Sequence, residues 1–169
     1  GLGIGARRMT ISTAGVAPGI RRLTHEGLQV NLALSLNAAE QALRARLMPI
    51  AETHPLPELL DALREYLSGV GRLVTLEYVL LGGINDTTDC ADELADIASG
   101  LLCKVNLICY NEIENGPFSP PDDVTQEAFY TRLRQRCPTV VRRISRGSDI
   151  GAGCGQLCVR DRGGEGAEN

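Results

Sequence analysis

Hydrophobic positions along this chain follow two alternating periods. Short apolar runs predict β-strands, and longer stretches with apolar residues three and four positions apart predict helices. Strands are expected at residues 9–12, 29–36, 73–81, 104–110 and 139–144, and helices at 16–26, 38–47, 56–69, 88–101 and 123–136. Such an alternation of strands and helices predicts parallel strands joined by right-handed crossovers.

The helix expected at 56–69 has the most complete pattern. Pro55 and Pro57 stand near its start, and Gly69 and Gly71 stand at its end, as is typical of helix boundaries. One apolar stripe runs along it, formed by Leu56, Leu59, Leu60, Leu63 and Leu67. A stripe of this width predicts that the helix packs on a sheet.

The two faces of the expected strands differ in polarity. In the strand near 73–81, Thr75 and Glu77 share one face, opposite an apolar face of Val74, Leu76, Tyr78 and Leu80. In the strand near 29–36, an apolar face of Val30, Leu32, Leu34 and Leu36 opposes a face of Asn31, Ala33, Ser35 and Asn37. A sheet covered by helices on both sides has apolar residues on both faces. The pattern therefore favours an α/β fold with an open, partial parallel (β/α) barrel of about five βα units over a Rossmann-type sheet.

Polar residues gather where the expected strands end. They are Ser12, Thr13, Ser35, Asn37, Asn85, Asp86, Asn111 and Ser145. In α/β barrels and open sheets the carboxyl ends of the strands form the edge that binds ligands. Each residue alone is equally explained as a turn or helix cap, but their presence on nearly every strand predicts a ligand site.

Composition is that of an ordinary globular domain. The 169 residues are 43% hydrophobic and 22% charged, which fits one domain with a real core. Without a long apolar run or a basic-then-apolar leader, we expect a soluble, cytoplasmic protein that contacts no membrane. The six cysteines are expected to be reduced thiols, and residues 161–169 are expected to form a disordered tail.

Charge is distributed unevenly along the chain. The net charge is −4, but residues 1–46 hold six arginines and two acids, whereas residues 47–138 hold six basic and fifteen acidic residues. A polyanion such as RNA would meet the arginine-rich ends and avoid the centre. A solvated basic face explains the same charges.

One cysteine stands in a glycine-rich segment near the end of the chain. Cys154 lies within residues 148–157, among Gly151, Gly153 and Gly155, and follows a group of arginines formed by Arg142, Arg143 and Arg146. The glycines allow close approach of another molecule, and the arginines favour the thiolate. The pattern predicts a reactive thiol, with a small residue filling a tight turn as the alternative.

Other candidate motifs are incomplete. The glycines of residues 1–5 match no nucleotide-binding fingerprint, and Glu77, His25 and His54 have no partner in the sequence that indicates catalysis. Cys154 and Cys158 begin a C-x3-C spacing, but Asp161 stands where a third cysteine would complete an iron–sulfur loop. No metal ligand is therefore predicted in this chain.

Six separated segments together resemble one known family. They are residues 3–15, 34–38, 46–50, 77–86 and 105–108 and the Cys154 segment. In this order and spacing they resemble the RlmN/Cfr family of radical S-adenosylmethionine (SAM) methyltransferases that modify RNA adenine. The resemblance extends from residue 1 to about residue 160.

The resemblance implies a fold, a reaction and a set of site residues. It implies a partial (β/α) barrel that uses SAM and a 4Fe–4S cluster to methylate carbon 2 of an adenine in large-subunit ribosomal RNA and, in some members, in transfer RNA. Cys154 matches the cysteine that carries the methyl group as a methyl-cysteine intermediate. The family's SAM contacts match Ser12, Ser35, Leu36, Asn37 and Asn111.

The chain also departs from the family pattern. The cluster loop, its ligands and the second, resolving cysteine are absent, so residues 1–160 are expected to be the carboxyl-terminal part of the barrel and to be inactive in isolation. Asn37 stands where the family usually has His, and Cys109 where it usually has Pro. Gly151 and Gly153 stand where it usually has Asp and Ala.

Two other interpretations remain open. The chain is alternatively a non-catalytic α/β nucleotide- or RNA-binding module, a truncated or degenerate relative. A half-barrel also exposes unpaired strand edges, so self-association is expected. The resemblance leaves open ribosomal or transfer RNA as the target, and carbon 2 or carbon 8 as the methylated atom.

Overall fold

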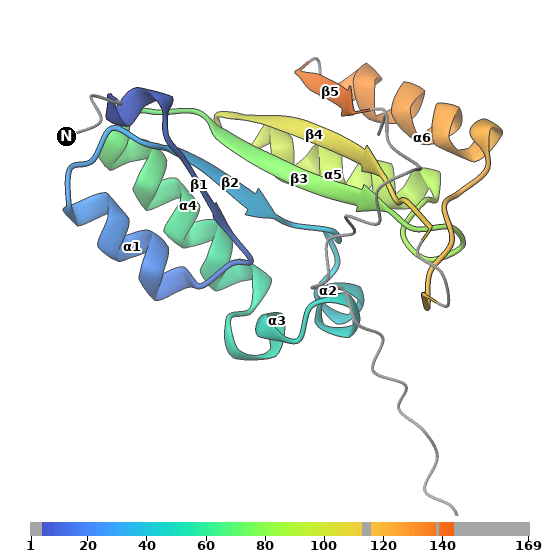
Figure 1. The fold of residues 1–169 in the computed structure, drawn as a ribbon, viewed down its shortest axis with the longest axis horizontal. Helices are drawn as coiled ribbons and strands as arrows, with labels where there is room; N and C mark the ends of the chain where they lie inside the picture. The colour runs from blue at the N-terminus through green and yellow to red at the C-terminus, as the bar shows by residue number, and fades with distance from the viewer. Residues whose placement is uncertain (1–4, 113–115, 138, 144–169) are drawn as a thin grey trace, which may run out of the picture.

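One sheet of five parallel strands forms the centre of the molecule (Figure 1). The computed structural model describes residues 5–112, 116–137 and 139–143. The strands lie side by side in the order of the sequence. They are β1 (Thr10–Thr13), β2 (Asn31–Ser35), β3 (Val74–Leu80), β4 (Cys103–Cys109) and β5 (Val140–Arg143). All five expected strands and their parallel pairing are confirmed.

Helices connect the strands and lie against the sheet. A short 3₁₀ turn at Ala6–Arg8 precedes β1. The helices are α1 (Ala17–His25), α2 (Gln41–Leu47), α3 (Ile50–Thr53), α4 (Leu56–Val70), α5 (Thr88–Ser99) and α6 (Asp123–Arg136). Helix α1 packs along α4, and α5 packs along α6 (Figure 1).

The expected helix at 38–47 was wrong over its first three residues. Helix α2 begins at Gln41 because the Glu40 carboxylate caps it, accepting hydrogen bonds from Ala42 N at 2.8 Å and Leu43 N at 2.7 Å. A carboxylate at this position satisfies backbone donors that lack a partner in the first turn. The short helix α3 was not expected from the sequence.

Side-chain alternation in β3 agrees with the prediction. Val74, Leu76, Tyr78 and Leu80 are fully buried, while Thr75 and Glu77 are half-buried. The buried face belongs to one core cluster that also contains residues of α1, α4, α5 and α6. The Tyr78 ring, for example, lies 5.5 Å from the Phe129 ring of α6. The described helices that build this core therefore cover a single face of the sheet.

Two residues assigned to the polar face of β2 are buried. Ala33 is 3% exposed, and its methyl group lies between Ser12 of β1 and Thr75 of β3 in the strand register. Asn37 is 4% exposed and has a left-handed backbone with φ of 59°. The strand has already ended at Ser35, so the alternation of faces does not extend to Asn37.

Strand β1 forms an edge of the described sheet, and apolar side chains are exposed near it. Met9, Ile11 and Val16 are between 38% and 43% exposed. A mainly apolar hollow of about 320 Å³ lies between β1 and α1. Self-association through such an edge stays a prediction. Within the described ranges, no helix has the length and apolar character needed to cross a membrane.

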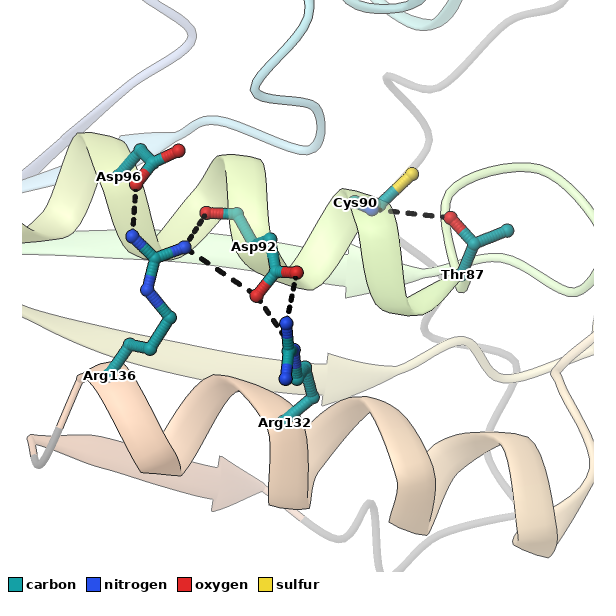
Figure 2. Close-up of polar contacts among 6 residues, drawn as sticks. All are labelled: Thr87, Cys90, Asp92, Asp96, Arg132 and Arg136. Carbon is teal, nitrogen blue, oxygen red and sulfur yellow. Dashed lines mark hydrogen bonds and ion pairs between the residues drawn. The ribbon is translucent and has the colours of Figure 1, made fainter.

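Ion pairs join α5 to α6 (Figure 2). Arg132 donates two hydrogen bonds of 2.8 Å to the Asp92 carboxylate, and Arg136 contacts both Asp92 and Asp96. The hydrogen bond from Arg132 is the main cause of a lowered pKa of Asp92. At the start of α5, Thr87 Oγ1 accepts a hydrogen bond from Cys90 N at 3.2 Å, so Thr87 caps this helix.

Substituting Asp92→Asn is expected to lower the free energy of unfolding at neutral pH, because Arg132 and Arg136 lose their shared carboxylate. The folded pKa of Asp92 lies below its ordinary value of 3.8, so its contribution is complete above that value and is lost as the pH falls through the folded pKa. In urea unfolding, the difference between wild type and variant should be constant down to about pH 5 and then shrink.

The matched control is Asp61→Asn, which removes a pair with Arg64 inside α4 alone. This variant is expected to change the free energy of unfolding less, because an exposed pair within one helix contributes little. The difference in the free energy of unfolding between wild type and Asp92→Asn should be smaller at about pH 2 than at neutral pH. An equal difference at both pH values would show that the Asp92 carboxylate is not the stabilising group.

Candidate functional site

The candidate site lies on the sheet face that the core helices leave open, from the middle of β3 and β4 to the carboxyl end of β2. Paired residues of neighbouring strands point to the same face. Ser12 pairs with Ala33, and Ser35, two residues further along β2, pairs with Glu77 of β3. Glu77 in turn pairs with Asn106 of β4. Ser35, Glu77 and Asn106 therefore form a row across three strands, which we call the polar row.

The polar row offers hydrogen-bonding groups at the surface of the sheet. Ser35, Glu77 and Asn106 are each half-buried, and Ser12 is exposed. A hydroxyl, a carboxylate and an amide together donate and accept hydrogen bonds, and the carboxylate attracts a cationic group. Such a set suits a ligand that carries hydroxyl and ammonium groups.

Sequence reasoning missed two members of this row. Glu77 was assigned no catalytic role because it has no partner nearby in the sequence, and Asn106 was noted only as part of the family resemblance. Both lie on the face opposite the buried residues of their own strands. Side chains alternate between the two faces along each strand, and the strands pair in parallel. Together these two facts would have placed both residues beside Ser35.

Leu36 cannot present its side chain to a ligand on the open face. The side chain is fully buried in the main core cluster. Its backbone N donates to Glu77 O at 2.9 Å, and its carbonyl accepts from Ala38 N at 2.8 Å. A cofactor contact by Leu36 stays a prediction.

Asn37 is held by neighbouring protein groups. Its Oδ1 accepts a hydrogen bond from Val79 N at 3.0 Å, and its Nδ2 lies 3.4 Å from Met48 Sδ. The side chain therefore attaches the turn after β2 to β3. Its predicted role as a SAM contact stays untested, as does that of Asn111, which is exposed shortly after β4.

Asn85 joins the turns that follow β2 and β3. Its side chain is fully buried, and Nδ2 donates to Asn37 O and to Val79 O, both at 2.8 Å. Its Oδ1 accepts from Leu81 N at 2.8 Å. The sequence placed Asn85 among the strand-end polar residues, and the structure shows that it connects backbone segments.

The loop around residues 116–121 packs on the turn after β3. Gly82 N donates to Ser119 O at 2.8 Å, and a Cβ at Gly82 would lie 2.9 Å from Pro120 O. Phe118 is buried, with its ring 5.8 Å from that of Tyr110. This loop and the Asn85 contacts together hold the turns at the carboxyl edge.

Three of the described cysteines are poor nucleophiles. Burial raises the pKa of Cys103 to about 12 and also raises the pKa values of Cys109 and Cys137. These thiols are therefore protonated at neutral pH and lack the thiolate that reacts. Cys154, the predicted reactive thiol, lies outside the described residues, as does Ser145.

Cys109 takes part in a small polar group under α6. Its Sγ donates to Gln126 Oε1 at 2.8 Å, and the same oxygen accepts from Arg142 at 3.2 Å. Arg142 also pairs with Glu127 at 2.7 Å. Cys109 thus contributes to the packing of β4, β5 and α6.

The described residues do not fit an iron–sulfur cluster. No three of their His, Cys, Asp and Glu side chains are grouped so as to hold a metal ion. The polar row, in contrast, offers a hydroxyl, a carboxylate and an amide to a polar organic ligand.

Comparison with known proteins gives matches along nearly the whole chain. The dual-specificity RNA methyltransferase RlmN of Pelobacter propionicus is 49% identical over 157 residues, which are 93% of this chain and 45% of that protein. The corresponding protein of Geobacter sulfurreducens is 46% identical and covers 93% of this chain. The chain is a homologue of the RlmN methyltransferases. It spans somewhat less than half the length of these relatives.

Solved structures agree with this relationship. A radical SAM methyltransferase from Sphaerobacter thermophilus superposes with a TM-score of 0.86 and 46% identity, over 93% of this chain and 46% of that chain. A domain of the pyruvate-formate lyase-activating enzyme of Bacteroides vulgatus, 13% identical, shares the fold with a TM-score of 0.59. No protein-family model matches the chain. The RlmN resemblance and the open, partial α/β barrel fold are thereby confirmed.

Substituting Asn85→Ala is expected to lower the free energy of unfolding of this RlmN homologue by about 3 kcal/mol, because it leaves buried backbone groups without partners. Urea unfolding followed by circular dichroism measures the change. Asn111→Ala, at an exposed strand-end position, is the matched control and should stay within about 0.5 kcal/mol of wild type. Equal stabilities of the two variants would show that Asn85 does not join the turns.

Proposed function

We propose that residues 1–160 form the carboxyl-terminal part of a cytoplasmic radical SAM enzyme that methylates carbon 2 of adenine in large-subunit ribosomal RNA and transfer RNA. The supporting observation is the polar row on the open face of a one-sided parallel sheet, which begins with Ser35 at the carboxyl edge, in a chain homologous to RlmN. Enzymes of this barrel type bind their ligands at that edge.

Within this proposal the polar row and its neighbours hold SAM, which supplies the methyl group. The Glu77 carboxylate accepts hydrogen bonds from the ammonium group, and the Ser12 and Ser35 hydroxyls and the Asn111 amide bind the remaining polar groups. Leu36 and Asn37 contribute the shape of the turn after β2. The 4Fe–4S cluster takes its ligands from a part of the longer protein outside this chain, because the described residues do not fit it.

Cys154 is proposed as the methyl carrier. A thiolate is the form of cysteine that accepts a methyl group, so Cys154 must lose its proton more easily than the buried thiols Cys103, Cys109 and Cys137. The arginines that precede it in the sequence favour this ionisation. The target adenine has to leave its stack to reach the residue, and the surrounding glycines leave room for the base.

The runner-up is a non-catalytic nucleotide- or RNA-binding module. The side chain of Asn37, at a position where the family usually has His, is buried and already bonded to Val79 N and Met48 Sδ, which supports this alternative. The two proposals differ in whether Cys154 gains a methyl group.

Glu77→Gln is expected to weaken SAM binding at least about tenfold, because a charged hydrogen bond to the ammonium group contributes about 1.5–3 kcal/mol. Isothermal titration of the protein expressed with the remainder of its gene measures the dissociation constant. Ser99→Ala, at the exposed end of α5, is the control and should leave it unchanged. If Glu77→Gln binds SAM as tightly as wild type, the polar row is not the SAM site.

Methylation of Cys154 tests the reaction itself. The longer protein is expressed anaerobically, its cluster is reconstituted, and peptides are analysed by mass spectrometry after incubation with SAM. One added methyl group is expected on the Cys154 peptide and on no peptide of Cys154→Ala, while Cys109→Ala retains it. A protein that binds its cluster and SAM but leaves Cys154 unmethylated supports the non-catalytic module.

A further inference from the structure

A buried arginine lies directly beneath the candidate site. Arg44 of α2 is 0% exposed. Its Nη2 donates to Ala14 O at 2.7 Å and lies 3.5 Å from Ser35 O. Its Nε and Nη1 atoms are buried without a hydrogen-bond partner in the part of the chain that the structure describes.

Such an arrangement is energetically unfavourable for the isolated side chain. Removing a cation from water without a paired anion costs free energy. Among the described residues, no carboxylate forms an ion pair with Arg44, and burial lowers its pKa to about 10. An apolar side chain of similar length would fill the same space without this cost.

The neighbouring backbone makes room for the guanidinium. Gly15 follows Ala14 and has φ of 109°, a conformation that other residues rarely adopt. A Cβ at Gly15 would lie 2.7 Å from Arg44 Nη2. Two separate positions of the sequence thus agree in placing this cation under the strand ends.

The two carbonyls that Arg44 contacts belong to neighbouring strands of the site. Ala14 directly follows β1, which carries Ser12, and Ser35 is the last residue of β2 and a member of the polar row. Both carbonyls lie where the strands end. Nη2 carries two N–H groups, so this one nitrogen can face both strand ends at once.

We propose that Arg44 is a positioning residue that fixes the ends of β1 and β2 so that Ser12 and Ser35 hold SAM in one geometry. This inference rests on the proposed function. It explains why a costly buried cation stands where an apolar residue would pack. It follows that replacing Arg44 with an apolar residue should weaken SAM binding without lowering the stability of the fold.

The test uses Arg44→Met in the protein expressed with the remainder of its gene. Methionine fills the space without the cost of burying a charge, so the thermal unfolding midpoint is expected to be equal or higher. The dissociation constant for SAM is expected to rise at least tenfold, which is about 1.4 kcal/mol. Arg44→Lys, which keeps one charged donor, should recover part of the affinity.

Arg64→Met is the matched control, because Arg64 is exposed on α4 and pairs with Asp61. It should change neither the midpoint nor the SAM affinity. Unchanged SAM affinity in Arg44→Met would overturn the proposal. A parallel loss of stability and affinity in Arg44→Met would also overturn it, because Arg44 would then be needed for folding in general.

Hydrogen exchange separates this inference from the proposed function. The amides of Gly15 and Leu36 are hydrogen-bonded to Thr13 Oγ1 at 3.1 Å and to Glu77 O at 2.9 Å. If the wild-type protein does not bind SAM, the proposed function is wrong. The exchange rates of these two amides then test the role of Arg44 independently of SAM. Faster exchange of both in Arg44→Met supports the positioning of the strand ends, and unchanged exchange overturns it.

Discussion

The open face of the sheet depends on the apolar packing of its opposite face. In β3 the buried residues Val74, Leu76, Tyr78 and Leu80 alternate with Thr75 and Glu77. Burial of each large apolar side chain stabilises the fold by about 1.5–3 kcal/mol. Because one side of the strands provides most of these residues, α1, α4, α5 and α6 pack on that side. The polar row therefore lies on the opposite face, where its side chains are only partly buried.

The carboxyl edge is held together by a separate set of contacts. Three connecting segments meet there, and a small apolar cluster that includes Leu81, Tyr110 and Phe118 holds them together with buried amide groups. Asn85 bonds to the turns after β2 and β3, and Gly82 bonds to the loop around residues 116–121. A site that is already ordered loses less conformational freedom when a ligand binds. The edge thus combines an ordered backbone with partly exposed polar side chains.

The strands were predictable from the sequence, because their apolar runs are short and bounded, and the parallel register then placed Ser12, Ser35 and Glu77 on one face. The start of α2 was not predictable, since it depends on a left-handed Asn37 and on the cap at Glu40. The buried state of Leu36 was predictable as well, because strand parity placed it on the apolar face of its strand. The role of Arg44 was not predictable, because arginine is usually exposed and helical periodicity does not reveal which backbone carbonyls a side chain will meet.

The order of the strands has a consequence for how such a molecule is assembled. Each strand pairs with the next one along the chain, and paired residues are 21 to 42 positions apart, as for Thr10 with Asn31 and Leu32 with Val74. In the described sheet, no strand lies between two strands that are consecutive in the sequence. The entropy lost in closing each connection is therefore similar from one unit to the next. Folding of such a sheet can extend one βα unit at a time, and each terminal strand can act as the template on which a further unit is added.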